Sequence, residues 1–216
     1  MINHAILQLK LNGKPVCIHS SMRSFGCRVD GLLESFLNAG CTVLVPTFSD
    51  MYEAPPVPEY MPEQNGAGDY SYFFDKEYVD EGVYCPDSNL LSVEDMGRFP
   101  QMVLEHIGRI RGDNALNSFA AVGPLAHSLV SGQTNDDVYA PLRKLYELDG
   151  YVLLMGTDLT TATAVHYAEQ LAGRAPFVRW AKGEKGTIPV RAGGCSEGFE
   201  KLFPMLEPYE QRILVG

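Results

Sequence analysis

The sequence has no long apolar run. Its 216 residues contain no uninterrupted stretch of about 18 apolar residues, the length that a membrane-spanning helix requires. The N-terminal segment MINHAILQLKLNGK also lacks the basic region followed by an apolar region that marks a secretory signal. We therefore expect neither a membrane span nor export, and we expect a cytoplasmic protein.

Cysteine is scarce, and its spacing suits neither a disulfide framework nor a metal site. The five cysteines occupy positions 17, 27, 41, 85 and 195, with no CxxC pair and no histidine nearby at a zinc-ligand spacing. This pattern indicates reduced thiols and no bound metal. Cys17 and Cys41 lie inside apolar runs, so we interpret them as small core residues.

Positive charge is in the minority. There are 17 Lys and Arg residues against 27 Asp and Glu residues, which gives a formal net charge of −10. Such a charge repels nucleic-acid phosphates and anionic lipids and attracts cationic small molecules. We therefore expect no nucleic-acid or membrane partner. An acidic surface that serves only solubility would have the same composition.

Signatures of two common enzyme classes are missing as well. No GxGxxG follows an apolar run, which leaves a dinucleotide site unsupported. No GxSxG elbow is present, which disfavours a serine hydrolase. What the chain does have is a 45% hydrophobic composition, enough to bury a sizeable core. Its length favours a single domain over residues 1–216.

The first clear pattern is a βαβ unit. PVCI and CTVLVPTF predict two buried strands, and DGLLESFLNA, residues 30–39, predicts a helix with Asp30 as its N-cap and Gly40 as its end. A crossover of this kind makes the two strands parallel neighbours. A ligand would then bind beyond their carboxyl ends, where HSSMRS and PTFSD lie.

Residues 50–92 follow no helical or strand period. This segment is rich in Pro, Tyr, Asp and Glu, and it is too long for a plain connection in a compact domain. We interpret it as an insertion over the active-site face, acting as a lid or a dimer contact. A surface insertion without function fits the same composition, although the aromatic content argues against disorder.

Regular patterns return in the second half. DMGRFPQMVLEHIGRI, residues 95–110, predicts a helix whose apolar side includes Ile107 and Ile110, and YVLLMG predicts a buried strand. TATAVHYAEQLAG then predicts a helix with Ala164, Val165, Ala168 and Leu171 toward the core. The result is an α/β fold, a central, partly parallel sheet flanked by helices.

His166 and Glu169 share one face at the start of that last helix. A helix N-terminus disfavours an imidazolium, whereas a nearby carboxylate favours it and orients the ring. Together these influences describe a general base. A half-buried histidine that is simply satisfied by its neighbour would show the same spacing, so the local pattern leaves both interpretations open.

Four segments in series resemble the aminoglycoside N3-acetyltransferase family, the acetyl-CoA-dependent antibiotic acetyltransferases that are distinct from GNAT enzymes. They are CIHSSMRSFG, TVLVPTFSD, NSFAAVGPLAHSLV and YELDGYVLLMGTDLTTATAVHYAE. The resemblance covers residues 10–182 and is weakest over 50–92. It implies an α/β fold in which acetyl-CoA, as co-substrate, and an aminoglycoside or another cationic amine meet in one cleft. A homodimer and a role in antibiotic resistance are further expectations.

The resemblance also implies roles for individual residues. The family motif Thr-x-x-His-x-x-Glu is matched by Thr163, His166 and Glu169, so that His166 would be the general base, Glu169 would orient it or hold the cationic substrate, and Thr163 would assist by hydrogen bonding. The coenzyme would be bound by five further residues: His19, Ser20, Ser21, Arg23 and Ser118. Amides near Thr160–Thr163 are candidates for stabilising the oxyanion.

The chain departs from the family pattern in two places. Relatives carry Arg-Ser-x-His-Pro-x-x-Ser where this chain has RGDNALNS, which keeps Arg111 and Ser118 but puts Asn114 and Ala115 in place of His-Pro. The chain also ends earlier than the family pattern predicts. Two alternatives follow: an acetyltransferase for a different biosynthetic amine, and a non-catalytic relative that binds a coenzyme or ligand.

Overall fold

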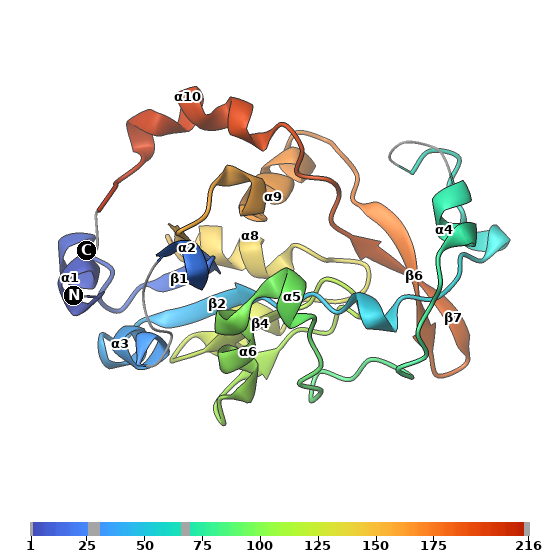
Figure 1. Ribbon diagram of the computed structural model, residues 1–216, viewed down its shortest axis with the longest axis horizontal. Coiled ribbons are helices and arrows are strands. Elements are labelled where there is room, and N and C mark those ends of the chain that lie inside the picture. The colour runs from blue at the N-terminus through green and yellow to red at the C-terminus, as the bar shows by residue number, and fades with distance from the viewer. Residues whose placement is uncertain (1, 26–30, 66–69, 214–216) are drawn as a thin grey trace.

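Five strands form a central mixed sheet (Figure 1). The computed structural model describes residues 2–25, 31–65 and 70–213. The strand order is β3-β4-β2-β1-β5, in which β1 pairs in parallel with β2 and β5, and β4 is antiparallel to β2 and β3. The strands are β1 (Pro15–Ser20), β2 (Thr42–Pro46), β3 (Ile110–Arg111), β4 (Phe119–Val122) and β5 (Tyr151–Met155). The predicted α/β fold with a partly parallel sheet is confirmed.

Helices pack on both faces of this sheet. Val16 and Ile18 of β1 belong to one core cluster and Cys17 to the other, because successive side chains of a strand point to opposite faces. The first cluster includes residues of α1 (Ile2–Gln8), α3 (Leu32–Asn38) and α6 (Arg98–Glu105); the second includes residues of α7 (Ala126–Val130) and α8 (Ala140–Glu147) and is contacted by α9 (Ala164–Leu171). No described helix is long and apolar enough to cross a membrane.

The predicted βαβ unit is present. Residues of β1 and β2 pair in parallel from Pro15 with Thr42 onward, and α3 lies between the two strands in the chain. Gly31 directly precedes the helix, while Asp30, the expected N-cap, lies outside the described residues. Gly40 adopts φ 75°, which ends the helix as predicted. Cys17 and Cys41 are both fully buried, which confirms them as core residues.

The predicted helix over residues 95–110 is wrong in extent. α5 (Val93–Met96) and α6 are separated by Gly97, whose φ of 84° interrupts the helix. α6 ends at Glu105, so that Ile107 is fully exposed and Ile110 lies in β3. The turn between them is held by Arg109, whose backbone N–H donates to the carbonyl of His106 and whose side chain donates to the carbonyl of Leu104.

The strand β5 was expected to be buried, and it is buried only at its end. Tyr151 and Val152 are 37% and 39% exposed, whereas Met155 is buried. The reason is topological. β5 is at the edge of the sheet and pairs with β1 alone among the described strands, a position that an apolar sequence run does not reveal.

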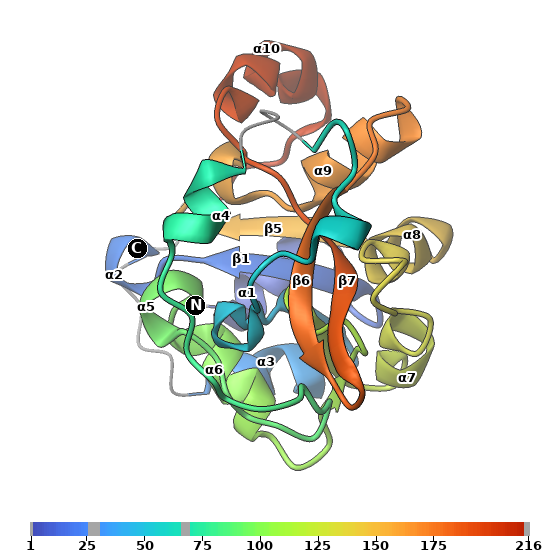
Figure 2. The same cartoon turned by 90° about the vertical axis from the view of Figure 1, so that its right-hand side faces the viewer.

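Residues 50–92 are irregular, as predicted, and are anchored to the rest of the protein by a few buried side chains. They contain only η1 (Asp50–Tyr52), η2 (Pro58–Tyr60) and α4 (Ser71–Asp75) among their described residues. The segment packs against the hairpin of β6 (Phe177–Gly183) and β7 (Gly186–Ala192), as Figure 2 shows. Ala54 donates to the carbonyl of Trp180, whose indole is fully buried. The rings of Tyr52 and Tyr84 meet edge to face beside this hairpin.

Candidate active site

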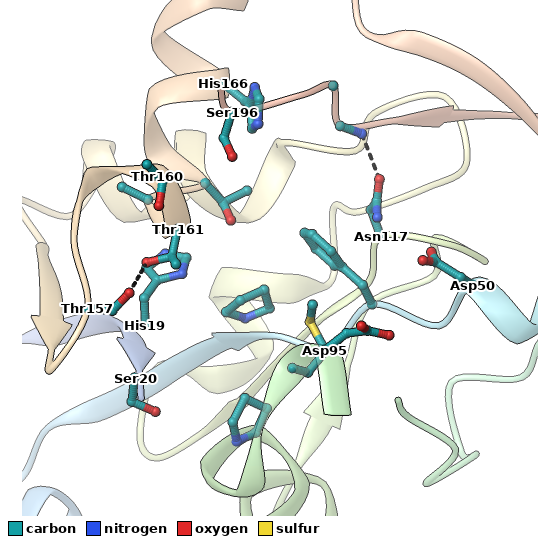
Figure 3. A pocket seen from close by; sticks show the side chains of 18 of the residues that line it. His19, Ser20, Asp50, Asp95, Asn117, Thr157, Thr160, Thr161, His166 and Ser196 are labelled. Atoms are coloured by element: carbon teal, nitrogen blue, oxygen red, sulfur yellow. Dashed lines mark hydrogen bonds between the residues drawn. The ribbon is translucent and has the colours of Figure 1, made fainter. Parts of the chain in front are cut away.

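A cavity of about 400 Å³ opens at the carboxyl ends of β1 and β2 (Figure 3). His19 and Ser20 line it from the end of β1, and Pro46 and Phe48 line it from β2 and the residues after it. This is the edge of the sheet where the βαβ pattern places a ligand. The volume falls within the range of pockets that bind small molecules.

His166 enters the cavity from the first turn of α9. Its Nδ1 lies 2.8 Å from Oε2 of Glu169, and the residue is 9% exposed. An ionised carboxylate can only accept a hydrogen bond, so Nδ1 carries the hydrogen and donates it. Nε2 is then the ring nitrogen left to accept a proton from a ligand. The pair therefore has the arrangement of a general base with an orienting carboxylate.

Two aromatic rings fix the plane of His166. The Tyr139 ring is stacked nearly parallel to it, with centroids 6.3 Å apart, and the Phe199 ring packs against it at 4.7 Å. Burial, with a smaller effect from the charge of Glu169, raises the pKa of Tyr139, so its phenol stays protonated at neutral pH. The imidazole therefore has little freedom to rotate.

The predicted core face of α9 is wrong for Ala168 and Leu171 and right for Ala164. Ala168 is exposed and Leu171 is 67% exposed, whereas His166 is buried. The helix packs through Ala164, as predicted, and through Tyr167 against the core cluster that contains Cys17. A helical pattern of small apolar residues could not distinguish these faces, because alanine suits both a packed and an exposed position.

His19 and Ser20, which the resemblance assigns to the coenzyme, line the same cavity. His19 is 5% exposed, and burial lowers its pKa to about 4, so the imidazole is neutral at pH 7. Cys17 lies nearby, with its Sγ 3.7 Å from His19 Nε2, but burial raises the pKa of this thiol to about 12. A fully buried, protonated thiol is not a nucleophile. Ser20 Oγ is buried and has no hydrogen-bond partner among the described residues.

Three other expected coenzyme contacts are placed elsewhere. Ser21 directly precedes α2 (Met22–Phe25) and Arg23 lies within it. Neither residue lines the cavity. Ser118 is fully buried, donating to the carbonyl of Thr47 at 2.9 Å and accepting from Arg111 Nε at 3.0 Å. Ser118 therefore stabilises the fold, because its hydroxyl group is fully engaged with Thr47 and Arg111.

Thr163 lines the cavity and is 7% exposed. It immediately precedes α9, and its carbonyl accepts the backbone N–H of His166. The amides before it are already engaged: Thr160 and Thr161 donate to Asp158, and Ala162 donates to Leu159. Of the amides of residues 160–163 that were expected to stabilise an oxyanion, those of 160–162 are therefore already bonded within this loop.

The far side of the cavity carries carboxylates that the sequence did not single out as site residues. Asp50 and Asp95 lie on this side in Figure 3. Burial, followed by the charge of Glu53, raises the pKa of Asp50. Glu53 itself has a side chain only 3% exposed and forms ion pairs with Lys76 and with Arg179, the latter at 3.2 Å. These ion pairs join segments that are distant in sequence, so local patterns could not reveal them.

Asn114 explains how the chain tolerates its departure from the family pattern. Its side-chain amide donates to the carbonyls of Thr134 and Arg191, and its Oδ1 accepts from the N–H groups of Leu116 and Asn117. Asn117, which sequence reasoning missed, lines the cavity and accepts the N–H of Gly193 at 2.6 Å (Figure 3). The replacement thus builds its own fully bonded loop beside the cavity.

The same stretch requires glycine at position 112. A Cβ there would clash with Gln133 Oε1, and that oxygen accepts the N–H of Phe119 at the start of β4.

Within the part of the chain that the structure describes, no group of three or more His, Cys, Asp or Glu residues is arranged to hold a metal.

One family of known proteins matches this chain over most of its length. The model of the aminoglycoside 3-N-acetyltransferase family matches residues 17–200. The chain belongs to this family. It is 39% identical over 110 residues to aminoglycoside N(3)-acetyltransferase VIII of Streptomyces fradiae, covering 49% of this chain and 37% of that one. It is 36% identical over 92 residues to aminoglycoside N(3)-acetyltransferase VII of Streptomyces paromomycinus, covering 41% and 32%. The matches thus span about a third of these curated relatives.

Several solved structures have the same fold as this member of the aminoglycoside N3-acetyltransferase family. The YokD protein from Bacillus subtilis superposes with a TM-score of 0.73 at 20% identity, covering 96% of this chain and 86% of that one. Aminoglycoside acetyltransferase AAC(3)-Xa gives a TM-score of 0.71 at 21% identity, covering 96% and 80%. AAC-IIIb, solved as a binary complex with CoASH, gives 0.68 at 19% identity, covering 97% and 84%.

Proposed function

We propose that the chain is an acetyl-CoA-dependent N-acetyltransferase that transfers acetyl to the 3-amino group of an aminoglycoside or a similar amino sugar. The observation that carries this proposal is the His166–Glu169 pair. The Nδ1 of His166 is fixed by the Glu169 carboxylate, and its ring packs against two aromatic side chains. His166 also lines a cavity at the carboxyl ends of parallel strands.

The proposed reaction is direct transfer, with no acyl-enzyme. Acetyl-CoA supplies the acetyl group as a thioester. His166 Nε2 accepts the proton that the acceptor nitrogen loses as that nitrogen bonds to the carbonyl carbon, and the proton leaves with the thiolate when the C–S bond breaks. Glu169 stabilises the imidazolium that forms in between. Cys17 is excluded as a nucleophile by its complete burial.

The residues around the cavity fit both substrates. Ser20, Thr157, Thr160 and Thr161 provide hydroxyl groups on one side, suited to the amides of a pantetheine arm, and Ser20 Oγ is without a protein partner among the described residues. Asp50 and Asp95 provide carboxylates on the other side, suited to ammonium groups. A mutant of AAC(3)-IVa, which shares this fold at 20% identity, has been solved in complex with a gentamicin.

A different amine acceptor is the second candidate, favoured by the state of Glu53. Its charge is already balanced by Lys76 and Arg179, so it adds little net attraction for a cationic substrate. An acceptor with fewer ammonium groups than a typical aminoglycoside would fit this side of the cavity.

CoA release from acetyl-CoA, followed with a thiol reagent, tests the proposal. The acceptors are kanamycin-, gentamicin- and neomycin-type aminoglycosides and a series of monoamino and diamino sugars. Release that requires an aminoglycoside supports the first candidate, and release with only the smaller amines supports the second. Binding of acetyl-CoA without release in any arm would contradict both and favour a non-catalytic relative.

A further inference from the structure

The C-terminal end of α9 folds back onto the residue that orients His166. Gly173 adopts φ 97°, and its N–H donates to the carbonyl of Gln170. The N–H of Arg174 donates to the carbonyl of Glu169 at 3.0 Å. These two bonds form a Schellman motif, in which the residue after the left-handed glycine returns to the last full turn of the helix. The motif therefore brings Arg174 beside Glu169.

The two oxygens of Glu169 have different partners. Oε2 lies 2.8 Å from His166 Nδ1, while Oε1 forms an ion pair with Arg174 Nη1. The guanidinium of Arg174 also lies 5.6 Å from the centroid of the Phe177 ring, at the start of β6. One side chain thus bridges the carboxylate and the hairpin, and the carboxylate is held at both ends.

We propose that Arg174 is a positioning residue that acts through Glu169 on His166. The proposal rests on the proposed function, in which His166 is the general base. Arg174 does not line the main cavity; it lies behind it, beside Glu169 and His166 in a small adjoining pocket. Its contribution is to stop the Glu169 carboxylate from rotating, which keeps hydrogen on Nδ1 of His166 and leaves Nε2 free to accept a proton.

The physical basis is the number of torsions in a glutamate. A carboxylate held at one oxygen can still rotate, and any orientation that breaks its bond to Nδ1 lets the imidazole adopt the other tautomer. A second contact at the other oxygen removes this freedom. Arg174 has a side chain that is 49% exposed, so the ion pair alone adds little stability. We therefore expect its removal to affect turnover more than folding.

The chain offers a matched control. Arg143 also forms an ion pair with a carboxylate, Asp137, at 2.6 Å, and its side chain is 44% exposed. Asp137 does not contact a residue that we place in the reaction. Any effect of Arg174→Ala that Arg143→Ala does not share therefore reflects the link to His166.

Kinetics provide the first measurement, in the intact chain with acetyl-CoA and its best acceptor. Arg174→Ala should lower kcat about tenfold with both KM values within about twofold, as expected for a group that orients the base and does not bind substrate. Millimolar guanidinium should restore part of the lost kcat, and Arg174→Lys should retain more activity than Arg174→Ala. Arg143→Ala should match the wild type. Unchanged kcat in Arg174→Ala, or a loss that guanidinium does not restore, would overturn the proposal.

An NMR measurement keeps the proposal testable if no acceptor is turned over. Nitrogen-15 shifts of His166, assigned with a His166→Gln variant, should report hydrogen on Nδ1 in the wild type and in Arg143→Ala, and a mixture of tautomers in Arg174→Ala. An unchanged tautomer in Arg174→Ala would overturn the proposal. A wild type that releases no CoA would instead contradict the proposed function, and the NMR result alone would then decide the role of Arg174.

Discussion

Phe199 packs against the imidazole of His166, with ring centroids 4.7 Å apart and ring planes inclined by 60°. Phe199 is the first residue of η4 (Phe199–Leu202), which follows the β6–β7 hairpin and leads into α10 (Phe203–Leu206) and η5 (Glu207–Tyr209) above α9 (Figure 1). The candidate base on α9 is therefore covered by a segment from the C-terminal part of the described chain.

Phe199→Ala should impair both stability and turnover. Phe199 is only 6% exposed, so truncation leaves a cavity beside His166 and should lower the free energy of unfolding by about 3 kcal/mol. The imidazole also loses a contact that fixes its plane, so kcat should fall. Urea unfolding and CoA release measure the two effects. Phe199→Leu, which refills most of the volume, should recover most of the stability; if Phe199→Ala left kcat unchanged, the contact would have no part in orienting the base.

Lys76→Met should strengthen binding of cationic acceptors. Glu53 keeps Arg179 but loses one of its two neutralising partners, so the cavity becomes more negative. The acceptor KM should fall several-fold, most for the acceptor with the most ammonium groups, and the effect should weaken with added salt. Lys182→Met is the control, because Lys182 pairs with the exposed Asp80 away from the cavity. A KM that rises in Lys76→Met would mean that Lys76 itself contacts the acceptor.

Ser118→Ala distinguishes a structural from a coenzyme-binding role. The substitution removes an acceptor from the buried guanidinium of Arg111, which otherwise donates to the carbonyls of Thr47, Ser88 and Leu90. We expect a loss of about 1–3 kcal/mol in the free energy of unfolding and an unchanged KM for acetyl-CoA. A raised KM with unaltered stability would restore the coenzyme role that the family resemblance implies.

His19 should make the protein sensitive to mild acid. Burial lowers its pKa from 6.5 to about 4, so the unfolded chain takes up this proton at a higher pH than the folded one. The associated stability is fully present above pH 6.5 and is lost as the pH falls toward 4, on the order of 3 kcal/mol in total. Urea midpoints at several pH values should fall less steeply in His19→Gln. His127→Gln, at an exposed position, should keep the wild-type slope; equal slopes in all three proteins would contradict the assignment.

The sequence was sufficient for the parts of the fold that depend on local periodicity. β1, β2 and α3 follow from two apolar runs and a helical repeat between them, since parallel buried strands carry continuous apolar stretches. It was not sufficient for β5, because an edge strand and a central strand can share the same apolar run. It also missed the end of α6, where Gly97 and the turn at Arg109 divide one helical pattern into three elements.

The candidate site, like the fold, could be predicted from the sequence only in part. His166, Glu169 and Thr163 lie within one short segment, so their spacing on a helix places them together. Phe199 and Asn117 reach the same region from other parts of the chain, and only the tertiary fold brings them there. Residues 50–92 likewise gave no period, because their order comes from packing on a hairpin more than 80 residues later.

The most direct test of this mechanism is the kcat of His166→Gln for CoA release, measured beside the binding of acetyl-CoA to the same protein. Glutamine keeps a polar side chain at this position but cannot accept the proton from the attacking amine. We predict that kcat falls at least about 100-fold, the size of a general-base contribution, while acetyl-CoA binds as tightly as in the wild type. Wild-type turnover in this variant would contradict the assignment of His166 as the base.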